Sequence, residues 1–207
     1  MSGSGKTTLI KLILGFYKPN KGRIRIGSQD LSSINLKAWR KHCGVAMQEG
    51  FIFSDTIASN IAESDDRVNI ARVLSAITTA NIMDFIHDLP LGINTMIGSK
   101  GNGISQGQKQ RLFIARAVYK NPEFLFFDEA TNALDAKNES VIMHNLKEFL
   151  INKTAVVVAH RLSTVKNADK IIVLDKGKVA EEGTHQELIS LGGIYYNLVS
   201  EQLELGN

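Results

Sequence analysis

The sequence has a single cysteine among its 207 residues and a small net charge of +3. A lone cysteine cannot form an internal disulfide. Because Cys43 is followed by the small and apolar residues 44–46, we expect a buried structural thiol. Lysine and arginine do not gather in a run with interleaved aromatic residues, which disfavours the binding of nucleic acid.

Long apolar segments are also lacking. No stretch approaches the roughly 18 residues of a membrane-spanning helix, and no signal-peptide pattern is present. We therefore expect any link to a membrane to come through a partner or through residues outside this sequence. Internal repeats and low-complexity tracts are lacking too. A hydrophobic content of 43% predicts one domain, or one domain with a subdomain, around a substantial core.

The apolar pattern that is present predicts an α/β fold, with a mostly parallel sheet flanked by helices. Short apolar runs at residues 124–127, 155–159 and 171–174 are typical of buried parallel strands. Between the first two runs, four apolar residues recur at helical spacing, and these are Ile142, Leu146, Phe149 and Leu150. A further short strand is expected at residues 23–26.

The composition also predicts how the chain divides. Residues 1–55 and 121–183 are expected to form the α/β core. From about residue 56 to 120 the sequence has helical periodicity and a glycine-rich stretch, so we predict a helical subdomain inserted into the core. Residues 184–207 predict C-terminal helices that are interrupted at Gly192-Gly193.

The first eight residues match most of a phosphate-binding loop, whose full pattern is G-x-x-x-x-G-K-[ST]. Backbone N–H groups of such a loop surround the β-phosphate, its lysine reaches the β- and γ-phosphate oxygens, and the next hydroxyl ligates Mg²⁺. The expected nucleotide ligands are Ser2, Gly3, Ser4, Gly5, Lys6, Thr7 and Thr8, with Thr7 also a metal ligand. A helix is expected to begin at Gly5 and run towards Leu14, with its N-terminus facing the phosphates.

A second motif supports the first. Four consecutive apolar residues, 124–127, are followed by Asp128 and Glu129, which describes a buried strand whose carboxyl end presents two acids. Ligands of α/β sheets bind at this end of the strands. Asp128 would hold Mg²⁺ through water, and Glu129 would polarise a water for attack on the γ-phosphorus. The alternative is a solvent-facing acid pair after a core strand, and the phosphate loop favours the catalytic interpretation.

A third motif occupies residues 102–111, ahead of an apolar helix expected at 112–119. Ser105 and Gly107 stand at the N-terminus of that helix, where free N–H groups and the helix dipole make a site for an anion. Because the phosphate loop already serves one nucleotide, a second anion site indicates a nucleotide that is held by another subunit.

With these three motifs the chain resembles the ATP-binding cassette (ABC) ATPases over nearly its whole length. The family signature LSGGQ corresponds to residues 104–108, so the resemblance adds Gln108 to the nucleotide ligands. It further implies a Q-loop residue at Gln48, which would ligate Mg²⁺ and sense a transmembrane partner. Asp135 would be the D-loop aspartate. His160 would be the switch histidine, which donates a hydrogen bond to the γ-phosphate. The implied cofactors are ATP and Mg²⁺.

Within the family, residues 159–164 and the aromatic stretch 51–57 resemble those of exporters. Phe51 and Phe53 would line the groove that receives a coupling helix of the membrane domain, and the alternative is that they belong to an ordinary core. A narrower resemblance is to bacterial peptide and bacteriocin exporters that have an N-terminal cysteine-peptidase domain, and it is carried by Trp39-Arg40 and by residues 105–111, 132–135 and 202–207.

The sequence departs from the family pattern at three places. The first glycine of the phosphate loop would fall one position before Met1, so we expect the preceding strand and the aromatic that stacks on adenine to lie outside this sequence. Gln106 stands where the signature has its first glycine, and we expect function to survive this change. Ser99 stands where exporters usually have an acid.

The resemblance implies an ATPase domain that works as a homodimer, with each ATP between the phosphate loop of one copy and the signature of the other. Hydrolysis would power export, of peptides in the narrower interpretation. The domain would lie at the cytoplasmic face of the inner membrane through a transmembrane partner on the same or another chain. Two alternatives stay open: a soluble ABC ATPase that is not coupled to transport, and an inactive truncated remnant.

Overall fold

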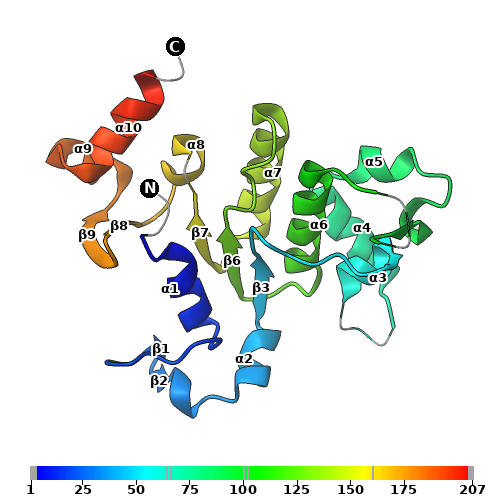
Figure 1. Cartoon of the computed structure of the whole chain (residues 1–207), viewed down its shortest axis with the longest axis horizontal. Helices are drawn as coiled ribbons and strands as arrows, with labels where there is room; N and C mark the ends of the chain where they lie inside the picture. Colours follow the sequence, from blue (N-terminus) through cyan, green and yellow to red (C-terminus); the bar gives the residue numbers. More distant parts are fainter. Residues whose placement is uncertain are drawn as a thin grey trace. The chain divides into compact units, whose positions relative to one another are not determined.

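A computed structural model describes residues 4–63, 65, 67–99, 101, 103–159 and 161–204. The chain forms two compact units, residues 23–156 and residues 1–22 with 157–207. Figure 1 labels their helices and strands along the chain. Each unit is built around its own apolar cluster.

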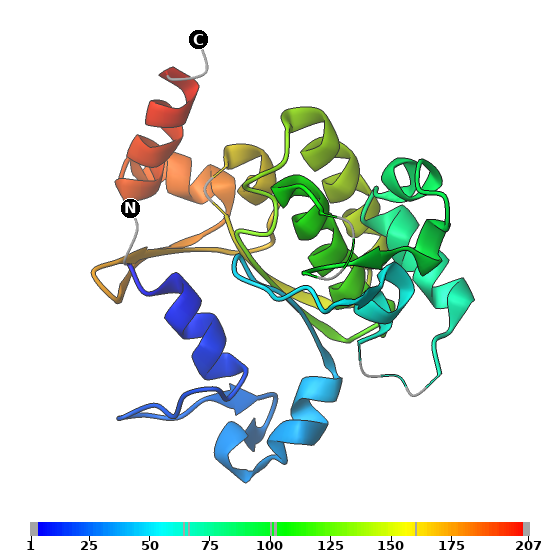
Figure 2. The same ribbon diagram turned by 45° about the vertical axis from the view of Figure 1, so that its right-hand side comes forward.

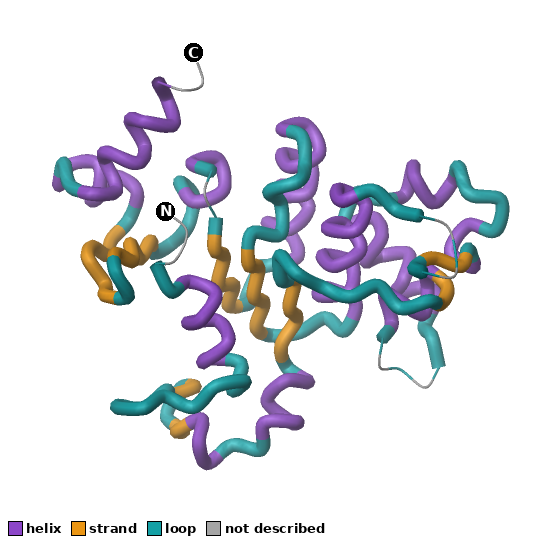
Figure 3. Tube along the Cα trace, viewed as in Figure 1, coloured by secondary structure: helices purple, strands orange, loops and turns teal. Residues whose placement is uncertain are grey.

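A three-stranded sheet, in the order β3-β6-β7, is the centre of the α/β part (Figures 1 and 3). Strand β3 (Cys43–Ala46) runs parallel to β6 (Phe124–Asp128), with Cys43 opposite Phe124 and Ala46 opposite Phe127. Helix α7 (Ala136–Phe149) connects β6 to β7 (Thr154–Val158). The predicted strand–helix–strand order and the α/β class are therefore confirmed.

Helices make up most of residues 57–119, beside the sheet (Figure 2). Their central member is α6 (Gln106–Tyr119), which packs on β3 and contacts α3 (Ile57–Ala62) and α4 (Ile70–Thr79). The remaining elements of this segment are α5 (Met83–His87), the 3₁₀-helix η2 (Gly92–Asn94), and the two-residue strands β4 (Asp55–Thr56) and β5 (Met96–Ile97), which pair antiparallel.

The segment before β3 is short and mostly exposed. It contains the antiparallel strands β1 (Arg25–Ile26) and β2 (Gln29–Asp30), the 3₁₀-helix η1 (Leu31–Ser33) and helix α2 (Leu36–Lys41). A strand was expected at residues 23–26, and it forms over the last two of them. The Asn35 side chain accepts hydrogen bonds from Lys37 N and Ala38 N, which caps α2.

The expected burial of Cys43 is confirmed. Its side chain is 9% exposed at the start of β3, and its Sγ donates to the carbonyl oxygen of Trp39 at 3.4 Å. Burial raises the pKa of the Cys43 thiol to about 12, because the thiolate would lose its hydration there. This cysteine is therefore an apolar packing residue.

Residues 4–22 and 157–204 form the second unit. Helix α1 (Lys6–Ile13) begins after Gly5 and ends at Leu14, as predicted. Its other elements are α8 (Leu162–Val165), β8 (Ile171–Asp175), β9 (Lys178–Gly183), α9 (His185–Leu191) and α10 (Ile194–Glu204). Gly192, with φ 67°, ends α9, so the predicted interruption of the C-terminal helices is confirmed.

Two strand predictions were wrong in part. The run at 171–174 does form a strand, β8, but it pairs antiparallel with β9. The reason is local: Lys176 and Gly177 both have positive φ, 48° and 76°, the backbone of a tight hairpin turn. The run at 155–159 forms most of β7, yet the residues of β7 are exposed or half-buried, because the strand lies at the edge of its sheet.

Candidate functional site

The phosphate loop leads directly into α1. Gly5 is the N-cap residue of this helix and has φ 93°, a left-handed conformation that glycine adopts without a steric penalty. Among the described residues no side chain caps α1, and its first turn has no acid. The N-terminal N–H groups and the positive end of the helix dipole therefore favour an anion such as a phosphate.

Lys6 and Ser4 are joined at the start of the same helix. The Lys6 ammonium donates a hydrogen bond of 2.8 Å to Ser4 Oγ, and Ser4 is 7% exposed. Thr7 and Thr8 are exposed in the first turn of α1. A hydroxyl, an ammonium and backbone N–H groups thus lie together at one helix end. Ser2 and Gly3, two further expected ligands, lie outside the described residues.

The two acids lie at the carboxyl end of β6. Asp128 is its last residue and is 2% exposed. Glu129 follows with φ 52°, in the left-handed region that non-glycine residues rarely adopt. Asn132 Nδ2 donates to Glu129 Oε2 at 2.7 Å, which holds this carboxylate in the loop that leads to α7. One acid is therefore buried at the strand end, and the next is turned into the following loop.

The surroundings of Asp128 fit a divalent cation. Its Oδ1 atom is buried and has no hydrogen-bond partner among the described residues. A buried carboxylate oxygen without a partner is costly, and a bound cation or its water would satisfy it. Gln48 lies exposed just after β3. Because β3 and β6 are parallel, their carboxyl ends lie side by side, and Gln48 follows one of these ends while Asp128 occupies the other. Oxygen ligands of this kind suit Mg²⁺.

The signature residues cap helix α6. Ser105 Oγ accepts from Gln108 N at 3.2 Å, and Gln108 Oε1 accepts from Ser105 N at 2.8 Å, which together form a capping box. The side chain of Gln108, an expected nucleotide ligand, is thus engaged in this cap. Gln106 is exposed at the first helical position with φ outside the left-handed region, so the glycine of the family pattern is not required by the backbone here.

A buried glutamine connects α6 to the loop that carries Glu129. Gln110 is 3% exposed; its Oε1 accepts from Ala133 N at 2.9 Å and its Nε2 donates to Glu129 O at 3.4 Å. The same loop ends at Asp135, whose Oδ1 accepts from Asn138 N at 2.9 Å and caps α7. The hydrogen bonds from Asn138 lower the pKa of Asp135.

Sequence reasoning missed Gln110 and two further polar residues, Asn60 and Arg116, which are described below. Gln110 gives no signal in the sequence, because it lies in the polar run of residues 108–111. His160, expected as the switch histidine, lies outside the described residues. Gln48, Asp128, Glu129, Asp135 and residues 105–108 belong to unit 23–156, whereas residues 4–8 belong to the other unit.

Phe51 and Phe53 lie on the surface. Phe51 is 68% exposed and Phe53 is 43% exposed, and their rings meet edge to face with centroids 5.2 Å apart. The alternative of an ordinary core position does not hold for these two residues. Ser99 Oγ lies 2.8 Å from Ser54 Oγ, so the residue that replaces the usual acid is hydrogen-bonded to the same segment.

Comparisons with known proteins identify the family of the chain. The sequence profile of the family described as "ABC transporter" matches residues 1–132. "ABC transporter B family member 13" of Arabidopsis thaliana is 46% identical over 201 residues, which cover 97% of this chain and 16% of the relative. "Alpha-hemolysin translocation ATP-binding protein HlyB" of Escherichia coli O157:H7 is 47% identical over 189 residues, or 91% of this chain and 27% of the relative.

A solved structure is similar throughout. "Structure of a bacterial Atm1-family ABC exporter with ATP bound" matches with a TM-score of 0.92 and 41% identity, over 98% of this chain and 35% of that chain. The chain therefore spans about a third or less of the length of these relatives. No helix within the described residues is long and apolar enough to cross a membrane. The chain belongs to the ABC transporter family, as an ATP-binding domain of exporter type.

Proposed function

We propose that this domain binds ATP with Mg²⁺ and hydrolyses it, and that the hydrolysis drives export across a membrane. The observation that carries the proposal is Asp128, whose buried Oδ1 has no partner among the described residues, directly before Glu129 at the carboxyl end of β6. Family membership and the uncapped N-terminus of α1 support the same activity.

The proposed roles follow the chemistry of phosphoryl transfer to water. Lys6 and the N–H groups of residues 2–8 bind the phosphates, and Thr7, Gln48 and Asp128 hold Mg²⁺, which neutralises phosphate charge. Glu129 orients the attacking water, and His160 donates a hydrogen bond to the γ-phosphate. Positioning and charge neutralisation provide most of the acceleration.

We further propose that two copies of the domain close head to tail around two nucleotides. Ser105, Gly107 and Gln108 of one copy then face the γ-phosphate bound by Lys6 of the other, and Asp135 lies at the interface between them. The N-terminus of α6 supports this assignment, since it offers N–H groups and a dipole to an anion.

The proposed partner is the transmembrane domain of an exporter, which would hold this domain at the cytoplasmic face of the inner membrane. The exposed Phe51–Phe53 pair supports docking of such a partner, because two aromatic rings gain most by burial against an apolar segment. We propose a peptide cargo on the resemblance to peptide exporters; labelled peptides offered to inside-out vesicles would test it.

The function is tested by Glu129→Gln in the assembled transporter. A neutral amide cannot accept the proton of the attacking water, so hydrolysis should slow by about 10²-fold or more while ATP still binds. ATPase turnover and equilibrium binding of a fluorescent ATP analogue measure the two effects. The matched control is Glu148→Gln, an exposed acid on α7. Wild-type turnover in the Glu129 variant, or no ATP binding by the unmodified protein, would contradict the proposal.

A further inference from the structure

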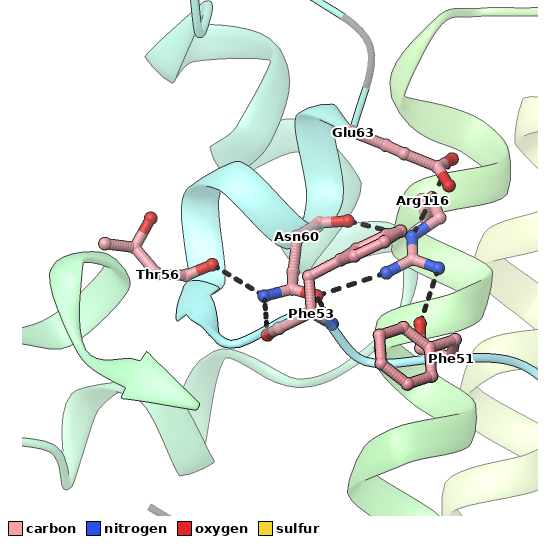
Figure 4. A network of polar contacts seen from close by, with 6 residues as sticks. All are labelled: Phe51, Phe53, Thr56, Asn60, Glu63 and Arg116. Carbon is pink, nitrogen blue, oxygen red and sulfur yellow. Dashed lines mark hydrogen bonds and ion pairs between the residues drawn. The ribbon is translucent and has the colours of Figure 1, made fainter. Parts of the chain in front are cut away.

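Asn60 and Arg116 hold the backbone of the exposed aromatic segment 51–56 from inside the protein (Figure 4). We call these two side chains the Asn60–Arg116 clamp. Asn60 is 1% exposed on α3, and Arg116 lies in the second half of α6 with its side chain 13% exposed. Neither residue belongs to the nucleotide-binding motifs.

The Asn60 side-chain amide binds the backbone of the segment at several residues. Its Nδ2 donates to the carbonyl oxygens of Phe53 at 2.9 Å, Thr56 at 3.0 Å and Asp55 at 3.4 Å. Its Oδ1 accepts from Phe53 N at 2.9 Å. Both backbone groups of Phe53 are thus bound by one buried side chain, which fixes the backbone under an exposed ring.

Arg116 ties this arrangement to α6. Its Nε donates to Asn60 O at 2.8 Å, Nη2 donates to Asn60 Oδ1 at 3.3 Å, and Nη1 donates to Phe51 O at 3.0 Å (Figure 4). The guanidinium carbon lies 5.5 Å from the centroid of the Phe53 ring. Glu63 Oε2 lies 4.0 Å from Nε. Burying a cation is costly unless such bonds are made, so this geometry is strongly specified.

The location of the clamp connects two functional regions. Helix α6 begins at the signature cap Ser105, and Arg116 is eleven residues further, which corresponds to about 16 Å along one helix. At its other end the clamp holds Phe51 and Phe53, which are exposed and form no part of the core. The network therefore fixes two surface residues in addition to joining α3 to α6.

We propose that Asn60 and Arg116 are positioning residues that hold the Phe51–Phe53 pair ready to dock an apolar segment of the transmembrane partner. Through Arg116 the pair is tied to α6, the helix that begins at the signature cap, so one helix joins the docking surface to the signature end. This inference rests on the proposed transport function, and it concerns how the domain is coupled rather than how ATP is cleaved.

The first measurement follows hydrogen exchange of the Phe53 amide, in the assembled transporter. Arg116→Met keeps an unbranched apolar stem and removes the donors of the guanidinium, whereas Arg116→Lys keeps the charge and loses the planar fork. Both variants, and Asn60→Asp, which loses the hydrogen bonds that Nδ2 donates, should speed this exchange by about tenfold or more. Amides of β3 and β6 should keep their protection, which shows that the variants are folded. Unchanged exchange at Phe53 would overturn the inference.

The second measurement is a double-mutant cycle on ATP turnover in lipid nanodiscs. Arg116→Met should lower kcat by about tenfold and leave KM for ATP unchanged, and Phe51→Ala/Phe53→Ala should do the same. Combining them should add nothing further, because both act through one docking surface. The matched control, Arg72→Met on the exposed face of α4, should leave kcat unchanged.

The two measurements separate the possible failures. If the losses in kcat caused by Arg116→Met and by Phe51→Ala/Phe53→Ala multiply when the substitutions are combined, Arg116 does not act through the aromatic pair. That result, or a rise in the KM for ATP, would show that Arg116 acts on the nucleotide site and would overturn the inference. A wild-type transporter that hydrolyses no ATP would instead overturn the proposed function. The exchange measurement still decides in that case whether the clamp positions the aromatic pair.

Discussion

At the scale of single residues, neighbours in the sequence have very different environments. Asp128 ends a core strand and is 2% exposed, whereas Glu129 turns into a loop with φ 52° and is held by Asn132. The strand ends between the two acids, and the left-handed backbone of Glu129 turns its carboxylate away from the direction that the strand gives Asp128. The buried Asp128 oxygen is suited to binding a cation, and the Glu129 carboxylate in the loop is suited to orienting a water molecule.

Cys43 gives the clearest prediction at this scale. Burial raises its pKa to about 12, from an ordinary value of 9.0. The folded protein therefore keeps the thiol proton over a pH range in which the unfolded chain loses it. Below pH 9 the group contributes its full stability, and that contribution declines as pH rises from 9 towards 12. At pH 8 we expect iodoacetamide to label Cys43 in urea and to leave the native protein unlabelled.

Mass spectrometry of the two samples makes the comparison, and Cys43→Ala is the control that should not be labelled in either. The native and urea-unfolded samples differ only in whether the thiol is enclosed. Equal labelling rates at pH 8 would contradict the burial of this side chain, since only the thiolate reacts at an appreciable rate.

At the scale of elements, locally encoded features could be predicted and pairings could not. Helix α1 follows the glycine of the phosphate loop, and α7 has an apolar spacing and the capping side chain of Asp135, so both are encoded within a few residues and form where expected. The partner of β8 depends on the turn at Lys176-Gly177 and on what covers its faces, so its predicted parallel pairing failed.

For the site, too, contiguous motifs could be predicted from the sequence and contacts between distant segments could not. The phosphate loop and the pair Asp128-Glu129 are contiguous motifs, which a single sequence displays directly. Arg116 and Asn60 are separated by 56 residues, and their hydrogen bonds exist only once α3 packs on α6. Arg116 is the one charged residue in the apolar run 112–119, but this local pattern does not indicate Asn60 as its partner.

Gly44 provides a prediction about the contact between β3 and α6. A Cβ at this position would overlap the carbonyl oxygen of Ala117 and lie 2.7 Å from Pro122 Cγ. Gly44→Ala must push the strand away from the end of the helix, which should destabilise the domain by about 1–3 kcal/mol. Chemical denaturation measures this loss as a lower denaturant concentration at the midpoint of unfolding. The slope of the free energy of unfolding against denaturant concentration should stay unchanged.

The control for this variant is Gly103→Ala, where an added methyl group meets no described atom within 4 Å. Its effect on the denaturation midpoint should be small by comparison. If Gly44→Ala is as stable as the control, the close packing of β3 against α6 is incorrect.

At the scale of the whole molecule, the proposed assembly assigns the chain two different parts of a nucleotide site. In that proposal the phosphate loop with α1 would bind one face of an ATP, and Ser105 at the N-terminus of α6 would contact the other face of an ATP held by a second copy. A head-to-tail dimer uses each half once per nucleotide and has two equivalent sites. The proposed assembly therefore requires that Ser105 and Lys6 act on the same ATP from different copies.

This requirement can be tested by combining two inactive variants. Ser105→Arg places a bulky cation at the signature cap and should abolish ATPase activity while nucleotide still binds to the phosphate loop. Lys6→Ala should abolish activity by removing the phosphate ligand. In a mixed dimer one site has Lys6 and Ser105 both intact, so an equal mixture should recover up to about a quarter of wild-type activity if the sites are independent. Recovery is measured as ATP turnover against mixing ratio, with each variant alone as the control. If Ser105→Arg prevents ATP binding to a single copy, or if no ratio recovers activity, Ser105 does not act across the dimer.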